Sequence, residues 1–375
     1  MSNPSSSEPF RVLVIGGYGF FGRRLVERLS LQAALHVIVA GRSAQQAAAL
    51  VSELRPTAAS ALSSVALDAM SDEFPAWLDR LQVRAVVHAS GPFQGQDYRV
   101  ALSCTAAGVH YVDLADGRDF VVGITAIDVA ATAAGVCVLS GASSVPALSG
   151  AAVDELTHGW RRVDAIDIGI SPGNRAERGL STVRAGLSYC GRPIPQADGA
   201  TLTGWLRTRA RRYPAPVGWR LLSPCDVPDP ALLPSRYPGR PVVHFGAGLE
   251  LFALHLGMNA MALVGRLGLV RDWTRHAEWL KRCSDRCMAF GTDAGAMHAT
   301  ARGLDAQGRP ARRTWTLLAT RGDGPWVPTL AAAALVRRLA AGATPAIGAR
   351  PCVGELTLDD FARETSGRHI AWRIE

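Results

Sequence analysis

The glycine-rich stretch RVLVIGGYGFFGRRL, residues 11–25, is the feature that most constrains the fold of this chain. Its first half is a short apolar run rich in valine and isoleucine, which is typical of a buried parallel strand. Its second half continues into FFGRRLVERLS, where Phe21, Leu25 and Leu29 recur at helical spacing. A strand that passes through glycines directly into a helix indicates the first unit of an alternating fold.

The same alternation continues to residue 142. Strand-like runs recur as HVIVAG, SSVALD, AVVHASG, HYVDLAD and VCVLSGA, separated by helical patterns, of which DFVVGITAIDVAATAAG predicts one long helix. This order predicts an α/β fold with a doubly wound parallel Rossmann sheet over residues 10–155, after a disordered tail at 1–9. From about residue 160 the alternation stops. PVVHFGAG and RRTWTLLATRG are expected to be antiparallel strands of a second, mixed α+β domain at 156–325.

The glycines after the first predicted strand match a dinucleotide-binding pattern. Gly17, Gly19 and Gly22 have the GxGxxG spacing, which allows a tight turn, close approach of the backbone to a pyrophosphate, and close packing of helix on strand. The N-terminus of the following helix would face the phosphates. The cofactor-binding residues predicted in this loop are Gly16, Gly17, Tyr18, Gly19, Phe20, Phe21 and Gly22.

An arginine follows the second predicted strand, where an acidic residue would bind the ribose hydroxyls of NAD. The residues there are Gly41, Arg42 and Ser43. The guanidinium can form charge-assisted hydrogen bonds with a 2′-phosphate, and the Ser43 hydroxyl can add another. Since a hydrogen bond to a charged group contributes about 1.5–3 kcal/mol, NADP is predicted to bind more tightly than NAD. The alternative is an exposed arginine on a loop without a ligand.

The carboxyl ends of the next three predicted strands are expected to complete this site, because ligands of open parallel sheets bind beyond those ends. Asp68 is expected beside the adenine. Asp113, after the fifth strand, either binds the cofactor ribose or caps the next turn. The HASGPF segment is expected beside the ribose and nicotinamide, through Ala89, Ser90, Gly91 and Pro92.

Composition argues against several classes of protein. The formal net charge is +8, and Lys281 is the only lysine. A basic chain favours anionic ligands. The sequence has no basic stripe with interleaved aromatic residues, so nucleic-acid binding is not expected. The seven cysteines are scattered and lack the spacing of a zinc site, so reduced thiols and no metal are expected. The N-terminus does not resemble a signal peptide, and a cytoplasmic protein is expected.

The apolar stretch LELFALHLGMNAMALVGRLGLV, residues 249–270, is long enough to span a bilayer. It contains Glu250, His255, Asn259 and Arg266, however, and charged residues are costly inside a spanning helix. A helix that is buried, forms a dimer contact or shelters an apolar substrate is therefore expected. Contact with a membrane surface stays open.

Several motifs together carry a family resemblance. The segments GGYGFFG, VAGRS, ASGPFQGQDY, AAGVHYVDLADGRDF and GASSVPALSG resemble the NADP-binding domain of the saccharopine dehydrogenase-like family, and DGPWVPTLAAAALVRRL and RPCVGELTLDDFARE resemble the closing segment of its bacterial members. The resemblance implies NADP(H)-linked hydride transfer. It also implies a middle domain that covers the substrate and often forms a dimer contact, and a C-terminal segment, 326–375, that returns to the first domain.

The loop SPGNRAERGLST, residues 171–182, is the best candidate for substrate binding in the second domain. It leads into a helix that Ser181 or Thr182 could cap, which would leave backbone N–H groups free to meet an anion. The alternative is a solvated basic loop. The predicted substrate-binding residues are Asn174, Arg175, Arg178 and Arg184.

Few residues could supply acid–base chemistry. Tyr98 follows the GPF loop and could donate a proton to a carbonyl or imine product, unless it only packs. Asp116 lies at the edge of the fifth strand. His88 lies within an apolar strand and is expected in the core. Lys281 lies in a charged helical stretch, so no Schiff-base role is expected.

These features predict an NADP(H)-dependent reductase that acts on the imine or carbonyl group of a small, acidic substrate and forms a homodimer. One alternative is an enoyl reductase that reduces the C=C bond of an acyl or lipid substrate. The other is a protein that binds NADP without turnover and serves as a sensor or scaffold.

Overall fold

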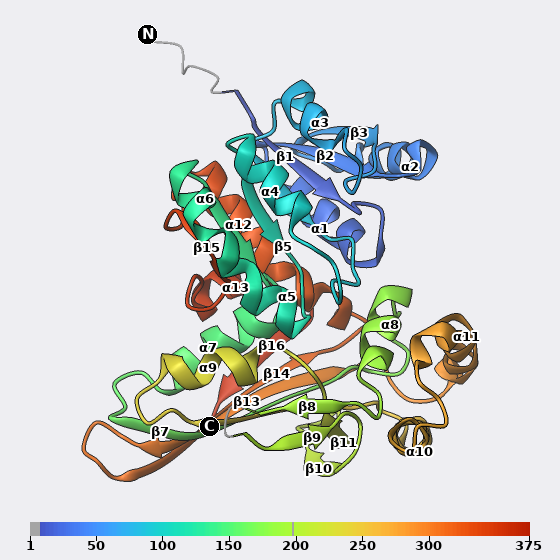
Figure 1. The fold of residues 1–375 in the computed structure, drawn as a ribbon, viewed down its shortest axis with the longest axis vertical. Helices are drawn as coiled ribbons and strands as arrows, with labels where there is room; N and C mark the ends of the chain where they lie inside the picture. Colours follow the sequence, from blue (N-terminus) through green and yellow to red (C-terminus); the bar gives the residue numbers. More distant parts are fainter. Residues whose placement is uncertain (1–7, 197–198) are drawn as a thin grey trace.

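Two seven-stranded sheets organise the protein, whose computed structural model describes residues 8–196 and 199–375 (Figure 1). Residues 1–7 of the predicted tail lie outside the described residues. Figure 1 shows the first sheet with its helices in the upper part of the molecule and the second sheet below it. Segments from the last fifty residues lie in both parts.

The first sheet is entirely parallel, in the order β15-β6-β5-β4-β1-β2-β3, and contains the doubly wound 3-2-1-4-5-6 arrangement. This confirms the predicted fold class. Its strands are β1 (Phe10–Ile15), β2 (Leu35–Gly41), β3 (Ala61–Ala66), β4 (Ala85–His88), β5 (His110–Asp113), β6 (Cys137–Ser140) and β15 (Gly348–Pro351). The helices between them are α1 (Phe20–Ser30), α2 (Ala44–Leu54), α3 (Phe74–Leu81), α4 (Arg99–Ala106), α5 (Arg118–Gly123), η1 (Ile124–Ile127) and α6 (Asp128–Ala133), followed by η2 (Ser144–Leu148) and α7 (Ser149–Leu156).

The single helix predicted over residues 119–135 is in fact three short ones, α5, η1 and α6. Gly123 ends the first of them, and glycine inside a helix is destabilising. The tighter turn of η1 places Ile124 and Ile127 in the core, where η1 packs against β15. The break in the helix therefore lies beside the added edge strand.

The second sheet is mixed, in the order β10-β11-β12-β7-β13-β14-β16. Its strands are β7 (Arg162–Ser171), β10 (Arg209–Arg212), β11 (Trp219–Pro224), β12 (Val242–Ala247), β13 (Gly295–Leu304), β14 (Pro310–Ala319) and β16 (Ile370–Ile374), and β8 (Pro193–Pro195) pairs separately with β9 (Thr201–Thr203). The helices of this domain are α8 (Leu180–Ser188), α9 (Asp229–Arg236), α10 (Phe252–Arg266), η3 (Trp273–His276), α11 (Ala277–Arg286) and η4 (Cys287–Ala289).

Both β12 and β14 were predicted to be antiparallel strands. The prediction is correct for β14, but β12 is antiparallel to only one of its two neighbours. β12 is antiparallel to β11 and parallel to β7. A parallel pair needs a crossover of a dozen or more residues, and the segment 172–241 between β7 and β12 provides it.

The C-terminal segment divides between the two sheets. η5 (Gly324–Thr329) and α12 (Leu330–Ala340) pack against α1, and β15 extends the first sheet beside β6. α13 (Leu358–Glu364) packs on α12. The expected return to the first domain does not hold for β16, which pairs with β14. Asp323 accepts a hydrogen bond from the His369 N–H at 2.6 Å, which directs the chain toward β14.

The main hydrophobic core is continuous between the domains, because the buried residues of α7 pack against η2 and also against β13 and β14 of the second sheet. α10, by contrast, has few fully buried residues. Within residues 8–196 and 199–375, no helix combines the length and the apolar character that are needed to cross a bilayer.

Candidate functional site

A cavity of about 1060 Å³ extends from the carboxyl edge of the first sheet to the second domain. One end is formed by the glycine-rich loop, Arg42 and the segment after β4. The other end is formed by β7, β12, α8, α10 and α11. This is where ligands of open parallel sheets bind.

The glycine-rich loop has the close packing that a dinucleotide-binding turn needs. Gly16 has a φ of +71°, and a Cβ on Gly22 would lie 2.0 Å from the Gly16 carbonyl oxygen. α1 begins at Phe20, and no side chain caps it among the residues that the structure describes. Its first N–H groups are therefore available to a phosphate. Gly16, Tyr18, Gly19, Phe20 and Phe21 line the cavity directly, whereas Gly17 and Gly22 permit the turn.

Arg42 and Ser43 have different surroundings. Arg42 lines the cavity, and across 8–196 and 199–375 its side chain makes no hydrogen bond or ion pair. The Ser43 hydroxyl caps α2 by accepting from the Gln46 N–H at 3.3 Å, and Ser43 is not part of the cavity lining. The Ser43 N–H donates to the Tyr18 hydroxyl at 2.9 Å. Tyr18 thereby ties the loop after β2 to the glycine turn, and of Arg42 and Ser43 only Arg42 lines the cavity.

The segment after β4 forms the middle of the cavity. Ala89, Ser90, Gly91 and Pro92 all line it, as does Asp68 after β3. The Gln96 side-chain amide donates to the carbonyl oxygens of Ser90 and Pro92 at 3.1 and 2.6 Å, which fixes this loop. From the second domain, the Ser181 hydroxyl donates to the Gly91 carbonyl oxygen at 3.1 Å. Ser181 does not cap α8, whose N-cap is Gly179.

His88 is buried, as expected, but it also borders the cavity. Its Nδ1 lies 3.1 Å from the Tyr111 hydroxyl, and burial lowers the pKa of His88 to about 4. The imidazole is therefore neutral at physiological pH. The apolar sequence of β4 predicted a buried His88 but not its place at the edge of the cavity.

The two candidate carboxylates have separate places. Asp113 lies outside the cavity lining, fully buried, and accepts from the Ala115 and Gly141 N–H groups and the Ser140 hydroxyl. It joins the ends of β5 and β6, which corresponds to the capping alternative rather than to ribose binding. Asp116 lines the cavity and accepts from the Gln94 side chain at 3.2 Å. Burial raises the pKa of Asp116.

The structure does not place Tyr98 in the cavity. Its hydroxyl donates to the Phe120 carbonyl oxygen at 2.8 Å, and its ring packs at 4.9 Å from the Phe120 ring. Burial raises the pKa of Tyr98 further. These contacts correspond to the packing alternative for Tyr98.

Of the four predicted substrate-binding residues, only Arg178 lines the cavity. Arg175 is exposed and donates to the Ala289 carbonyl oxygen, and Arg184 pairs with Glu278 at the surface. Asn174 is buried and supports Arg178, which donates to both Asn174 oxygens at 2.6 and 2.7 Å. Arg178 also donates to the Ser284 hydroxyl of α11.

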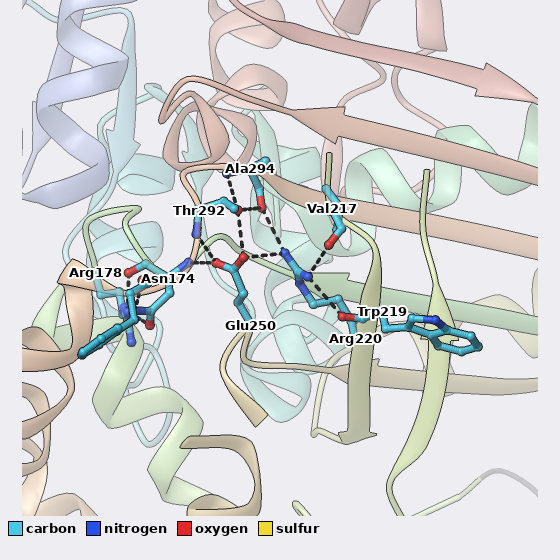
Figure 2. A network of polar contacts seen from close by, with 9 residues as sticks. Asn174, Arg178, Val217, Trp219, Arg220, Glu250, Thr292 and Ala294 are labelled. Atoms are coloured by element: carbon cyan, nitrogen blue, oxygen red, sulfur yellow. Dashed lines mark hydrogen bonds and ion pairs between the residues drawn. The ribbon is translucent and has the colours of Figure 1, made fainter. Parts of the chain in front are cut away.

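A buried carboxylate positions this loop (Figure 2). Glu250 forms an ion pair with Arg220 at 3.1 Å and accepts from the backbone N–H groups of Asn174 and Thr292 and from the Thr292 hydroxyl. Figure 2 shows Glu250 between Arg220 and the loop that holds Arg178. From the sequence, Glu250 was noted only as a charged residue within the apolar stretch 249–270.

The far end of the cavity is mainly apolar, and sequence reasoning missed most of it. One face of α10 lines this end through Leu254, Gly257, Met258 and Met261. Their spacing in the sequence indicates a helix face but does not show that the face borders a cavity. Lys281 of α11 also lines the cavity, with its ammonium group 2.7 Å from Asp285. Further walls come from Ile170, Val183, Leu187, Phe245 and Leu280.

Comparison with known proteins agrees with this geometry. Residues 12–140 match the family described as "Saccharopine dehydrogenase NADP binding domain". The first part of the chain is therefore similar to the NADP-binding domain of saccharopine dehydrogenase. This confirms the resemblance seen in the sequence.

One solved structure extends the likeness in fold to nearly the whole chain. Saccharopine dehydrogenase (L-Glu forming) from Saccharomyces cerevisiae superposes with a TM-score of 0.67 at 13% identity, covering 98% of this chain and 100% of that one. Amine dehydrogenase from Mycobacterium smegmatis matches with a TM-score of 0.46 at 12% identity, covering 94% and 97% of the two chains. No curated protein shows significant similarity to the chain. The whole chain thus has a fold similar to that of saccharopine dehydrogenase.

Proposed function

We propose that this protein is an NADP(H)-dependent oxidoreductase that reduces the imine or carbonyl group of a small substrate. One observation carries the proposal: a single cavity runs from the dinucleotide turn, past the Ser90–Pro92 loop, to a mainly apolar chamber in the second domain. A substrate in that chamber can lie against the segment where the nicotinamide is expected.

The residues present fit the cofactor. The glycine turn and the free N–H groups of α1 suit a pyrophosphate, and the unpartnered guanidinium of Arg42 suits a 2′-phosphate. NADPH supplies a hydride when it is bound. The protein orients the cofactor through these contacts and excludes water with the apolar walls beyond them.

Asp116 is the residue that we assign to proton transfer. It is the carboxyl group that lines the cavity near the Ser90–Pro92 loop, and burial raises its pKa, so it stays protonated to a higher pH than an exposed carboxyl. Gln94 orients it by donating to Oδ1. Arg178, which also lines the cavity, is the residue that we assign to binding an acidic group of the substrate.

A second candidate is reduction of a C=C bond in an acyl substrate, which the apolar face of α10 favours. NADPH oxidation measured against keto acids with amines, and separately against enoyl esters, distinguishes the two. Turnover with the first group supports imine or carbonyl reduction, and turnover with the second supports enoyl reduction. Tight NADPH binding without turnover on either panel would contradict both and favour a sensor or scaffold.

A further inference from the structure

The outward face of α10 is apolar although nothing in the described chain covers it. Phe252, Leu256, Leu263 and Leu267 are 50, 56, 50 and 66% exposed. They recur at positions i, i+4, i+11 and i+15, which places them on one side of the helix. Leu269 follows, 75% exposed. Contiguous apolar surface of this kind marks an interaction site. We call these five residues the α10 apolar face.

α10 has three sides with different neighbours. His255 and Ala262 are buried against the second domain, and Leu254, Met258 and Met261 line the cavity. The α10 apolar face forms the third side. Ala253 and Gly257, between the second and third sides, are both exposed and part of the cavity lining. The cavity therefore borders the α10 apolar face without a polar rim on this helix.

Exposed cations without an ion-pair partner in the described chain lie at the end of this face and on a second helix of the same cavity. Arg266 ends α10 and Arg271 follows it; both are exposed, and neither side chain has an ion-pair partner within 8–196 and 199–375. On α11, which lines the same cavity, Arg282 and Arg286 are also exposed and lack carboxylate partners in that part of the chain. They share a helix face with Trp279, which is 61% exposed.

A hollow beside the α10 apolar face adds to this charge. It has a volume of about 390 Å³ and is lined by Leu269, Val270, Arg271, Asp272, Arg275 and His276. Its one carboxylate, Asp272, lies 3.8 Å from Arg275. An apolar surface that borders a basic hollow matches the chemistry of an anionic headgroup above acyl chains.

We propose that the α10 apolar face docks the protein on an anionic lipid surface, with the cavity opening at that surface. Leucine and phenylalanine side chains enter the acyl boundary, and the flanking arginines contact the headgroups. No helix crosses the bilayer in this arrangement. The proposal is independent of turnover, because it concerns the surface and not the reaction.

Vesicle co-sedimentation tests the proposal with the full-length protein. The protein should bind vesicles of phosphatidylcholine mixed with phosphatidylglycerol at least about tenfold more strongly than vesicles of phosphatidylcholine alone, and added salt should weaken binding. Leu256→Glu combined with Leu263→Glu should reduce binding by about tenfold or more, because both side chains would leave the acyl boundary. Val129→Glu is the matched control, since Val129 is 84% exposed on α6 and should be neutral.

Two results would contradict docking on a lipid surface. Absence of binding to the anionic vesicles, or equal binding by the Leu256/Leu263 variant, would overturn the proposal. Light scattering reports the alternative occupant, a second copy of the chain. A dimer that the same substitutions convert to a folded monomer, without vesicle binding by the unmutated protein, would show a subunit interface instead. Circular dichroism checks that the variants fold.

Discussion

The two ends of the cavity are built in different ways. At the dinucleotide end, the working groups are backbone atoms and side chains of short loops, such as residues 16–22 and 89–92. At the substrate end, the Arg178 guanidinium donates to the Asn174 side chain. Asn174 in turn donates its backbone N–H to Glu250 and its side-chain amide to the Cys287 and Phe290 carbonyl oxygens. The first end depends mainly on local turns, with one hydrogen bond from Ser181 of the second domain to the Gly91 carbonyl oxygen. The second depends on segments more than 100 residues apart.

That difference implies different responses to mutation. A change in a short loop should alter cofactor binding with little effect on the second domain. A change in the Glu250 network should lower global stability and also displace Arg178. The following experiments test this contrast, beginning with the largest expected effect.

Glu250→Ala should have the largest effect on stability. It leaves the Arg220 guanidinium buried without its ion-pair partner, which costs about 3–5 kcal/mol. The free energy of unfolding in urea measures the loss. Glu278→Ala is the matched control, because the Glu278–Arg184 pair is exposed and should contribute about 0–1 kcal/mol. Equal losses in the two variants would show that the buried network does not stabilise the domain.

Asp113→Asn should change the pH dependence of stability. Burial raises the pKa of Asp113 to about 6, above its unfolded value of about 3.9. The native state therefore binds more protons between these values, and the stability that this group contributes at low pH is lost as pH rises to about 6. The expected loss is about 3 kcal/mol. Asp113→Asn should remove this part of the slope in unfolding experiments from about pH 4 to 6. An unchanged slope would be inconsistent with a buried, titrating Asp113.

Arg42→Ala should reduce the preference for NADPH over NADH by about 1.5–3 kcal/mol, because the 2′-phosphate loses a charge-assisted hydrogen bond. Calorimetry with both cofactors measures the difference. Affinity for NADH should change little. Arg23→Ala, which removes an exposed partner of Glu53, is the control. Equal affinities of the unmutated protein for NADPH and NADH would contradict the assignment.

Arg178→Ala and Arg175→Ala form a matched pair at the substrate end. Arg178 lines the cavity, so its loss should raise the KM for an acidic substrate by about tenfold or more. Arg175 is exposed and outside the cavity, so its loss should change KM by less than about fivefold. NADPH affinity should be unchanged in both. If Arg178→Ala weakened NADPH binding alone, Arg178 would belong to the cofactor site.

Tyr98→Phe should have the smallest effect. It removes the hydrogen bond to the Phe120 carbonyl oxygen, which contributes about 1 kcal/mol to stability, and leaves the cavity intact. The kcat should stay close to that of the unmutated protein. Asp116→Asn, inside the cavity, should lower kcat strongly by comparison. A large loss of kcat in Tyr98→Phe would restore tyrosine as the proton donor.

Prediction from sequence succeeded where the physics is local. The glycine turn, the alternating strands and the Ser90–Pro92 loop each depend on residues within a short window, and the family match covers the same region. The fold class of the second domain was also predictable. The exact pairing of β12 was not, because strand direction there depends on a long crossover.

The substrate end could not be predicted to the same extent. Arginine content marked the loop at 171–182, but which arginine faces the cavity depends on Asn174, Glu250 and α11. Likewise, the apolar stretch at 249–270 indicated a helix but not which of its sides would be core, cavity or surface. Tyr98 is close to the GPF loop along the chain, but its hydroxyl points to α5, which the sequence alone does not reveal.

The division of the C-terminal segment has a consequence for how the protein is made. β15 completes one edge of the first sheet and β16 completes one edge of the second, and both come from the last 28 residues of the chain, 348–375. While the ribosome is still translating them, each sheet lacks an edge strand. Domains often fold during synthesis, but here neither sheet can be finished before residues 348–375 have been made. A premature stop after β14 would leave two open sheet edges in one molecule, and such edges favour aggregation.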